Sequence, residues 1–141
     1  MFDILENYQN NGHFFLSEDK SLEKVCNAPK TASGVYVIYA LKGGKIELVY
    51  IGCSGKVLSN GQIKHRNGGL FDRIVNGKQF NDSRKKSWAA QVKKEKIEAL
   101  DIYWYETINN EIGDIPTYVE AVCMQRYFEI YGRLPRWNEA F

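Results

Sequence analysis

The sequence predicts a mixed α/β (α+β) fold, in which helices flank a small, largely antiparallel sheet of three strands. Short runs of β-branched and aromatic residues, typical of strands, alternate with segments that have helical spacing of apolar residues. The chain has 141 residues, 44% of them hydrophobic, which suffices for one core without disulfides or a structural metal. The expected order is strand, strand, helix, helix, strand, helix.

The first third of the chain contains the predicted hairpin. Residues 1–32 are predicted to be an N-terminal extension with a short helix at 21–26, and residues 33–141 to form the domain. Residues 34–41 and 46–52 are predicted strands, joined by the turn Lys-Gly-Gly-Lys at 42–45. A polar, glycine-rich loop follows at 53–69.

The remaining elements have clear boundary signals. A short helix at 70–76 is expected to stop at Gly77, and a second helix at 87–99 to be capped by Ser87. Residues 101–107 alternate as the third strand. The last helix is expected to begin near Asp114, to carry Pro116 in its first turn and to end before Gly132.

Cysteine usage and hydropathy exclude several classes of protein. The three cysteines form no CxxC pair, and with two histidines they give no zinc-like spacing. The start of the chain lacks the basic and apolar regions of a signal peptide, and no stretch reaches the length of a membrane span. A reduced, cytoplasmic location without a membrane partner is expected.

Charge is distributed unevenly along the chain. Residues 56–96 carry eleven Lys or Arg and three acids, a net charge of +8, whereas the other residues carry eight basic and fourteen acidic side chains, a net charge of −6. Chance clustering on a solvated surface is one explanation; a nucleic-acid backbone as partner is the favoured one. The candidate backbone contacts are Lys56, Arg66, Arg84, Lys85 and Lys86.

Two tripeptides, Gly-Val-Tyr at 34–36 and Tyr-Ile-Gly at 50–52, resemble the paired signature of the GIY-YIG nuclease family. Leu-x-x-Arg at 70–73, Glu120 and Asn138 match further family features in the same order. The resemblance spans residues 34–138. It departs from the family where Val35 replaces the usual Ile, where no His follows the arginine, and where the loop at 53–69 is long, as in the restriction-endonuclease-like branch.

The resemblance implies a metal-dependent DNA endonuclease with Tyr36, Tyr50, Arg73 and Glu120 as catalytic residues. Mg²⁺, or alternatively Mn²⁺, would be held by Glu120. Tyr36 is the leading general-base candidate by resemblance. A phenol is a weak base at neutral pH, so supporting groups are expected to supply positive charge or to act as the base instead: Lys56, Lys64 and His65.

Residue chemistry supports some of these roles independently. Glu120 falls at or within the apolar stripe of its helix, where a carboxylate is costly unless it has a partner. That partner is either an arginine, Arg73 or Arg126, or a Mg²⁺ ion, which needs only one or two protein carboxylates. Arg73 has the planar fork that suits a phosphate, with a solvated helix residue as its alternative. Asn138 is expected to tie the C-terminal segment to the site, or to be a simple turn residue.

Three functional hypotheses follow. The first is hydrolysis of a DNA phosphodiester bond to a 5′-phosphate and a 3′-hydroxyl. The second is a non-catalytic nucleic-acid-binding module of the same fold. The third is a nuclease that acts within a larger repair or mobile-element system. Cutting both strands with one site per chain requires either a homodimer or sequential nicking.

The hairpin register contains a conflict. A regular two-residue turn at Gly43-Gly44 would place Tyr36 opposite Ile51 and Tyr50 opposite Val37, and the two tyrosines would then point to opposite faces. A shared site therefore predicts either a loop of odd length or a β-bulge, with both hydroxyls on the face that also receives Arg73 and Glu120.

Overall fold

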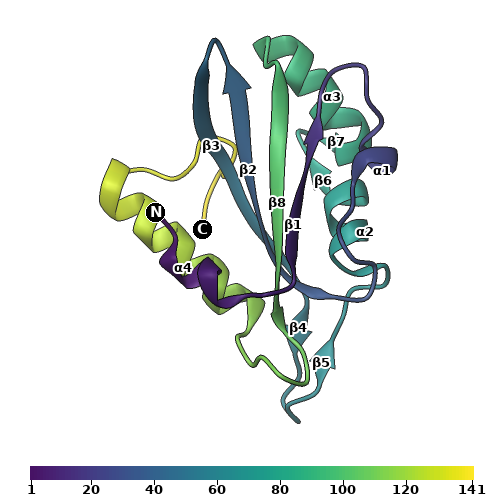
Figure 1. The fold of residues 1–141 in the computed structure, drawn as a ribbon, viewed down its shortest axis with the longest axis vertical. Helices are drawn as coiled ribbons and strands as arrows, with labels where there is room; N and C mark the ends of the chain where they lie inside the picture. Colours follow the sequence, from purple (N-terminus) through teal and green to yellow (C-terminus); the bar gives the residue numbers. More distant parts are fainter.

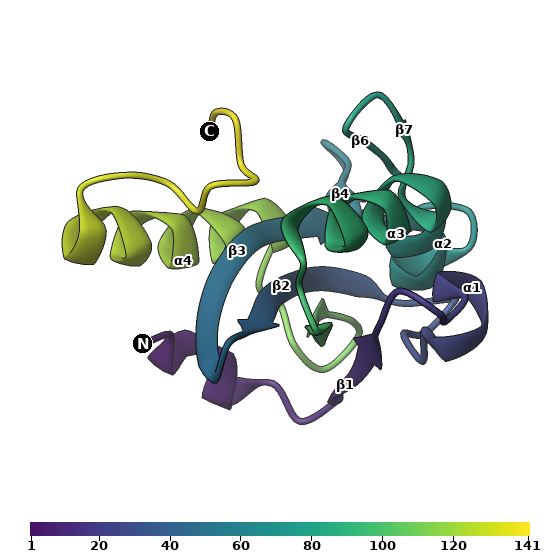
Figure 2. The same cartoon turned by 90° about the horizontal axis from the view of Figure 1, so that it is seen from above.

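The computed structural model describes all residues from 1 to 141 and shows one four-stranded antiparallel sheet with helices on both faces (Figures 1 and 2). The order of the strands across the sheet is β1-β8-β2-β3. Their bounds are Asn11–Leu16 for β1, Ala99–Ile108 for β8, Ser33–Lys42 for β2 and Lys45–Ser54 for β3. The mixed fold and its antiparallel sheet are confirmed.

The sheet has one strand more than predicted. After a short 3₁₀ helix η1 (Asp3–Asn7), strand β1 runs antiparallel to β8, from the pair Asn11 and Tyr105 to the pair Leu16 and Leu100. The prediction of three strands is wrong because β1 is an edge strand with only two buried residues, Phe14 and Leu16. Its sequence, with Gly and His among its first residues, has too little apolar alternation to be recognised.

Two layers of helices enclose the sheet. Helices α1 (Leu22–Val25), α2 (Gly69–Asn76) and α3 (Arg84–Glu95) pack on the face that carries Tyr36 and Ile38. Helix α4 (Pro116–Tyr131) packs with η1 on the face that carries Val35 and Val37. None of these helices is both long and apolar enough to cross a bilayer.

The helix ends differ in part from the prediction. Helix α3 begins three residues before Ser87, which lies buried inside the helix rather than at its cap, and ends where Lys96 adopts a left-handed conformation with φ 57°. Helix α4 ends at Tyr131, before Gly132, as predicted. Asp114 does not cap it, because Ile115 holds the cap position and the Asp114 carboxylate accepts a hydrogen bond from the Tyr8 hydroxyl at 2.7 Å.

Two small hairpins lie in the segments between the main elements. Strands β4 (Lys56–Val57) and β5 (Ile63–Lys64) pair within the predicted loop, and β6 (Lys78–Gln79) and β7 (Asp82–Ser83) pair between α2 and α3. Figure 1 shows β4 and β5 at the end of the molecule opposite the β2–β3 turn.

The β2–β3 hairpin contains the predicted β-bulge. Its turn has two residues, Gly43 and Gly44, both with positive φ, so of the two predicted alternatives the hairpin has the bulge and not the odd loop. The register is regular up to the pair Tyr39 and Leu48 and then shifts, so that Tyr50 lies opposite Ile38. Val49 is the extra residue, and every later side chain of β3 changes face.

The C-terminal segment fastens the bulge. The Trp137 N–H donates to the Val49 carbonyl at 2.9 Å. The Asn138 side chain donates to the Ile51 carbonyl at 2.9 Å and accepts from its N–H at 3.0 Å. Because β3 is an edge strand, these polar groups would otherwise lack a partner in the sheet.

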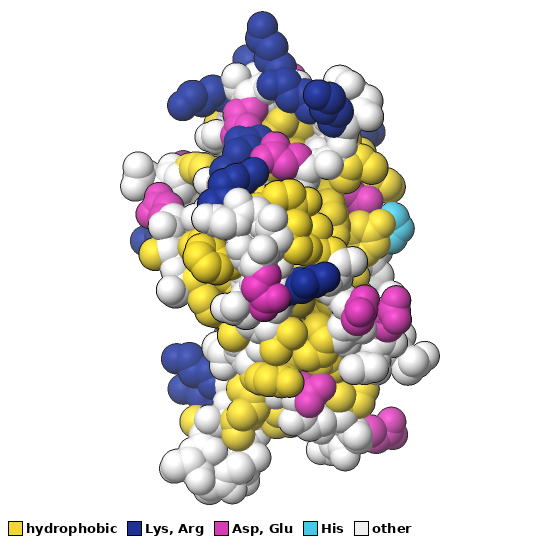
Figure 3. Space-filling model, turned by 90° about the vertical axis from the view of Figure 1, so that its left-hand side faces the viewer, with side chains coloured by type: hydrophobic (Ala, Val, Ile, Leu, Met, Phe, Trp, Pro, Cys, Tyr) yellow, Lys and Arg dark blue, Asp and Glu magenta, His cyan; other side chains and the backbone are white.

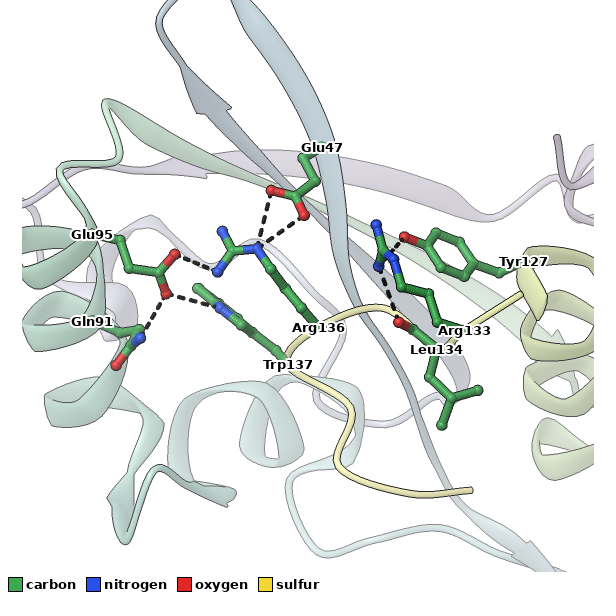
Figure 4. Close-up of polar contacts among 8 residues, drawn as sticks. All are labelled: Glu47, Gln91, Glu95, Tyr127, Arg133, Leu134, Arg136 and Trp137. Carbon is green, nitrogen blue, oxygen red and sulfur yellow. Dashed lines mark hydrogen bonds and ion pairs between the residues drawn. The ribbon is translucent and has the colours of Figure 1, made fainter. Parts of the chain in front are cut away.

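Ion pairs hold that segment in turn. Arg136 bridges Glu47 of β3 and Glu95 of α3, and the Trp137 indole N–H donates to Glu95 at 3.0 Å (Figure 4). The segment therefore links the bulged strand to α3.

Gly52 permits the tyrosines to lie side by side. A Cβ atom at this position would lie 2.5 Å from the Tyr36 ring and 2.8 Å from the Tyr50 ring. No other residue type fits without moving one of the rings.

We expect Gly52→Ala to lower the free energy of unfolding by about 1–3 kcal/mol, because the added methyl group forces the packed rings apart. Gly113→Ala is the matched control, since a Cβ atom there meets nothing within 4 Å. Urea denaturation of both variants tests this. Equal stabilities would mean that the rings can move aside freely.

Candidate active site

The bulge places Tyr36 and Tyr50 on one face of the sheet, as the shared-site hypothesis requires. Their ring centroids lie 6.0 Å apart. Tyr36 is fully buried, whereas Tyr50 is partly exposed. Burial raises the pKa of Tyr50 to about 12, although the charges of Arg84 and Arg73 oppose this shift. The Tyr50 phenol is therefore protonated at neutral pH.

Arg84 joins the two tyrosine hydroxyls. Its Nη1 donates to Tyr36 Oη at 2.6 Å and its Nη2 to Tyr50 Oη at 3.2 Å. It also donates to the Arg73 carbonyl at 2.9 Å and to Gln79 Oε1 at 3.2 Å. Its side chain is in no ion pair with a carboxylate.

The prediction that Arg84 contacts nucleic acid at the surface is wrong, because only 1% of the residue is exposed. It belongs to a run of three basic residues, of which Lys85 and Lys86 are exposed as predicted. The phase of α3 turns the first of the three inward. All three residues are basic, and the sequence does not show which of them is buried. The role of Arg84 beside the tyrosines was therefore not predicted.

Arg73 projects from α2 on the tyrosine face. Its pKa lies above the usual value, first because of the Coulombic interaction with Tyr36 and further because of a hydrogen bond to the same side chain and the proximity of Tyr50. Burial acts in the opposite direction. Arg73 is therefore partly buried beside the tyrosines and is not the fully solvated helix residue that was the alternative prediction.

A basic cleft of about 450 Å³ opens beside Arg73. Five of its lining residues carry a basic or imidazole side chain, and none is acidic. The full lining consists of Cys53, Ser54, Gly55, Lys56, Lys64, His65, Arg66, Arg73 and Thr117. Lys56 and Lys64 are direct cross-strand partners, an arrangement of like charges that costs stability. The predicted supporting residues Lys64 and His65 thus lie in one cleft with Arg73.

Two residues of the cleft have partners of their own. Arg66 pairs with Asp72 at 2.8 Å, so part of its charge is already neutralised. The His65 Nδ1 atom lies 2.6 Å from the Ser33 hydroxyl oxygen. This contact fixes the ring and leaves Nε2 without a hydrogen-bond partner in the chain.

Glu120 approaches from the other face of the sheet. It lies on α4 between Val119 and Cys123, which pack against the opposite core. The prediction that the tyrosine face also receives Glu120 is therefore wrong. The carboxylate instead reaches the edge strand, where it accepts a hydrogen bond from the Cys53 thiol and is within the electrostatic range of Arg73. Figure 2 shows α4 and the α2–α3 pair on either side of β3.

Glu120 is a half-buried carboxylate without an ion pair. The predicted partner Arg126 pairs with Glu129 at 3.7 Å, and no basic group lies within 4 Å of Glu120. Burial raises the pKa of Glu120, and the Cys53 hydrogen bond and the Arg73 charge offset this only in part.

These features fit a cation held by one carboxylate. The structure contains no group of three or more His, Cys, Asp or Glu side chains that could hold a metal ion. Mg²⁺ commonly keeps several waters and needs only one or two protein carboxylates, so Glu120 near the basic cleft fits its requirements. Zn²⁺, which prefers three or four protein ligands, does not fit.

The thiols near Glu120 are not nucleophiles. Burial, together with the nearby charge of Glu120, raises the pKa of Cys53 and of Cys123 to about 12. A protonated thiol does not attack a phosphate or a carbonyl.

Comparison of the chain with protein-family models, with curated proteins and with solved structures finds no match. The assignment of chemistry therefore depends on the geometry of these side chains.

We expect Glu120→Gln to unfold at a higher urea concentration than the wild type at neutral pH. The raised pKa means that the folded state disfavours the ionised carboxylate, whereas the unfolded chain does not. This cost is present at pH values above the folded pKa and disappears below the ordinary pKa, where both states are protonated. The advantage of the variant should therefore vanish as the pH falls. A pH-independent difference would show that the charge of Glu120 is not the cause.

Proposed function

We propose that the chain is a metal-dependent nuclease that hydrolyses phosphodiester bonds of DNA and leaves 5′-phosphate and 3′-hydroxyl ends. One observation carries the proposal: Arg73 lies in a cleft without acidic lining, and Glu120, which is in no ion pair, lies next to Cys53, one of the residues that line this cleft. A polyanion supplies the negative charge that the cleft lacks. A cation supplies the partner that Glu120 lacks.

We assign a separate role to each of the residues in and near the cleft. Arg73 binds a phosphate oxygen through its planar fork and stabilises the charge that develops there. Glu120 would hold Mg²⁺, with Mn²⁺ as the alternative, and the ion when bound would act as a Lewis acid on the phosphate. Lys56 and Lys64 bind the neighbouring phosphates of the backbone.

The tyrosines orient groups rather than accept protons. The Tyr36 hydroxyl is buried and accepts a hydrogen bond from Arg84, and Tyr50, with a pKa of about 12, is a donor at neutral pH. His65 lies in the cleft with one ring nitrogen fixed by Ser33 and the other without a partner. Imidazole is the commonest general base. We therefore assign to His65 the role of accepting the proton from the attacking water.

A binding module without catalysis is the second candidate function. The basic cleft alone would serve such a module. Glu120 argues against it, because an ionised carboxylate beside a phosphate backbone weakens binding unless a cation lies between them. The unpaired carboxylate favours the enzyme. Action as a homodimer, or within a larger repair or mobile-element system, is a further part of the proposal.

Cleavage of supercoiled plasmid in Mg²⁺ and in EDTA tests the proposed activity. We expect conversion to nicked or linear DNA only with the metal, and complete loss in Glu120→Gln, which keeps the size of the side chain but loses its charge. Binding of the plasmid in EDTA should stay within several-fold for this variant. Equal cleavage by the variant and the wild type would refute the single-carboxylate metal site.

Two further variants separate the roles in the same assay. Arg73→Ala should reduce turnover by about a hundredfold or more, because a charged contact to the transition state is lost. His65→Gln should also lose turnover, because the variant has no imidazole to accept a proton from water. Turnover within threefold of the wild type would return the role of base to another group.

The Lys56 and Lys64 pair should dominate the salt dependence of DNA binding. Each phosphate contact contributes about one unit to the slope of log K against log salt concentration. We expect Lys56→Ala with Lys64→Ala to flatten the slope by about one to two units. The matched control is Lys42→Ala with Lys45→Ala, which removes another cross-strand lysine pair at the opposite end of the sheet. An equal effect of both double variants would mean that the charge acts without regard to the cleft.

A further inference from the structure

A second groove, of about 1040 Å³, lies beside Tyr50 and apart from the basic cleft. It is bordered by the β6–β7 hairpin, by one side of α3 and by the C-terminal segment. Its lining combines aromatic, amide and lysine side chains, namely Tyr50, Lys78, Gln79, Phe80, Asn81, Gln91, Lys94, Trp137 and Asn138, with Glu139 as its one acidic residue and Ala140 at its end.

Phe80 stands at the tip of the β6–β7 hairpin in a strained conformation. Its φ is 55°, and that of Asn81 is 67°. Positive φ is common for Gly and Asn in such turns but rare for a bulky aromatic residue. The side chain is 38% exposed and contacts the Trp137 ring edge to face, with the centroids 5.2 Å apart. The turn thus presents an aromatic surface to the groove at a conformational cost.

The charged groups of the groove favour an anionic ligand. Lys78 and Lys94 are exposed and take part in no ion pair. Aromatic faces interleaved with lysines are typical of surfaces that bind single-stranded nucleic acid, where bases stack and phosphates meet the cations. A purely apolar peptide would leave both lysines without partners.

The floor of the groove is connected to the tyrosine pair. Gln79 Oε1 accepts hydrogen bonds from Arg84 Nε at 3.2 Å and from Trp88 Nε1 at 2.9 Å. The same Arg84 holds the hydroxyl of Tyr50, which lines the groove. A ligand in the groove therefore contacts the group of side chains that lies behind the proposed active site.

We propose that this groove binds an unpaired nucleobase of a single-stranded segment next to the duplex, stacked on Phe80, with its flanking phosphates at Lys78 and Lys94. The substrate class of the proposed nuclease is then DNA with an overhang, flap or other unpaired flank. The inference rests on the proposed function for the kind of polymer, but its test requires binding alone.

Fluorescence anisotropy in EDTA tests the inference without cleavage, on three labelled DNA probes. One is a blunt duplex, the second carries a short thymidine overhang, and the third carries an overhang of abasic sites, which has the same phosphates but no bases. We expect the thymidine overhang to bind at least about fivefold more tightly than the abasic one, as expected for a stacked base.

Phe80→Asn should remove this difference, because it deletes the ring while Asn keeps the turn conformation. Lys94→Ala should weaken both overhang probes alike. Phe128→Asn is the control: Phe128 is 51% exposed on α4, and its loss should change nothing. Helix α4 lies on the side of the molecule that Figure 3 shows, where several other apolar side chains are also exposed.

Equal binding of the thymidine and abasic overhangs by the wild type would overturn the inference, as would an unchanged preference in Phe80→Asn. Thermal melting verifies that the variants are folded. Binding without any plasmid cleavage would refute the nuclease and leave the groove intact. Plasmid cleavage together with an unchanged thymidine preference in Phe80→Asn would support the nuclease and refute the groove as a base-binding site.

Discussion

The single extra residue in β3 is the constraint on which the site depends. A two-residue turn at Gly43-Gly44 fixes the register of the hairpin, and strict alternation from that turn would separate Tyr36 from Tyr50 by the thickness of the sheet. The bulge at Val49 reverses the alternation between the turn and Tyr50. It needs outside fastening, because β3 has no partner strand on its open side, and Asn138 and the neighbouring Trp137 N–H supply it. The arrangement of the two tyrosines therefore depends on the hydrogen bonds that attach the C-terminal segment to β3.

Arg84 is the costliest group in this arrangement. A guanidinium that is 1% exposed and has no carboxylate partner loses most of its hydration, and removing an ion from water is expensive. Two phenolic oxygens, a backbone carbonyl and Gln79 accept its hydrogen bonds, and its Cζ lies 5.2 Å from each of three aromatic ring centroids. None of these partners cancels its charge. A carboxylate in their place would neutralise the positive potential that Arg84 adds behind Arg73.

The sequence predicted the bulge but not the strand order, for a physical reason. Alternation within a hairpin is a local property, so the conflict between Gly43-Gly44 and the two tyrosines could be read from a short segment. The position of Glu120 depends on which face of the sheet α4 covers, and that is set by contacts between elements far apart in the sequence rather than by a local pattern. Arg84 was missed for a similar reason. Whether the first or the third residue of a basic run turns inward is set by where α3 begins, and that boundary was misplaced by three residues.

The edge position of β3 explains how groups from opposite faces meet. In the centre of a sheet the strands would separate Arg73 on α2 from Glu120 on α4. At the edge only Cys53 and its neighbours lie between them, and each side chain needs to reach only past one strand. The C-terminal segment covers this edge at Val49 and Ile51, and the basic cleft lies farther along the same strand, at Cys53 and Ser54. An extended polymer can approach this edge without entering a cavity, which suits a backbone phosphate flanked by further phosphates better than it suits a small metabolite.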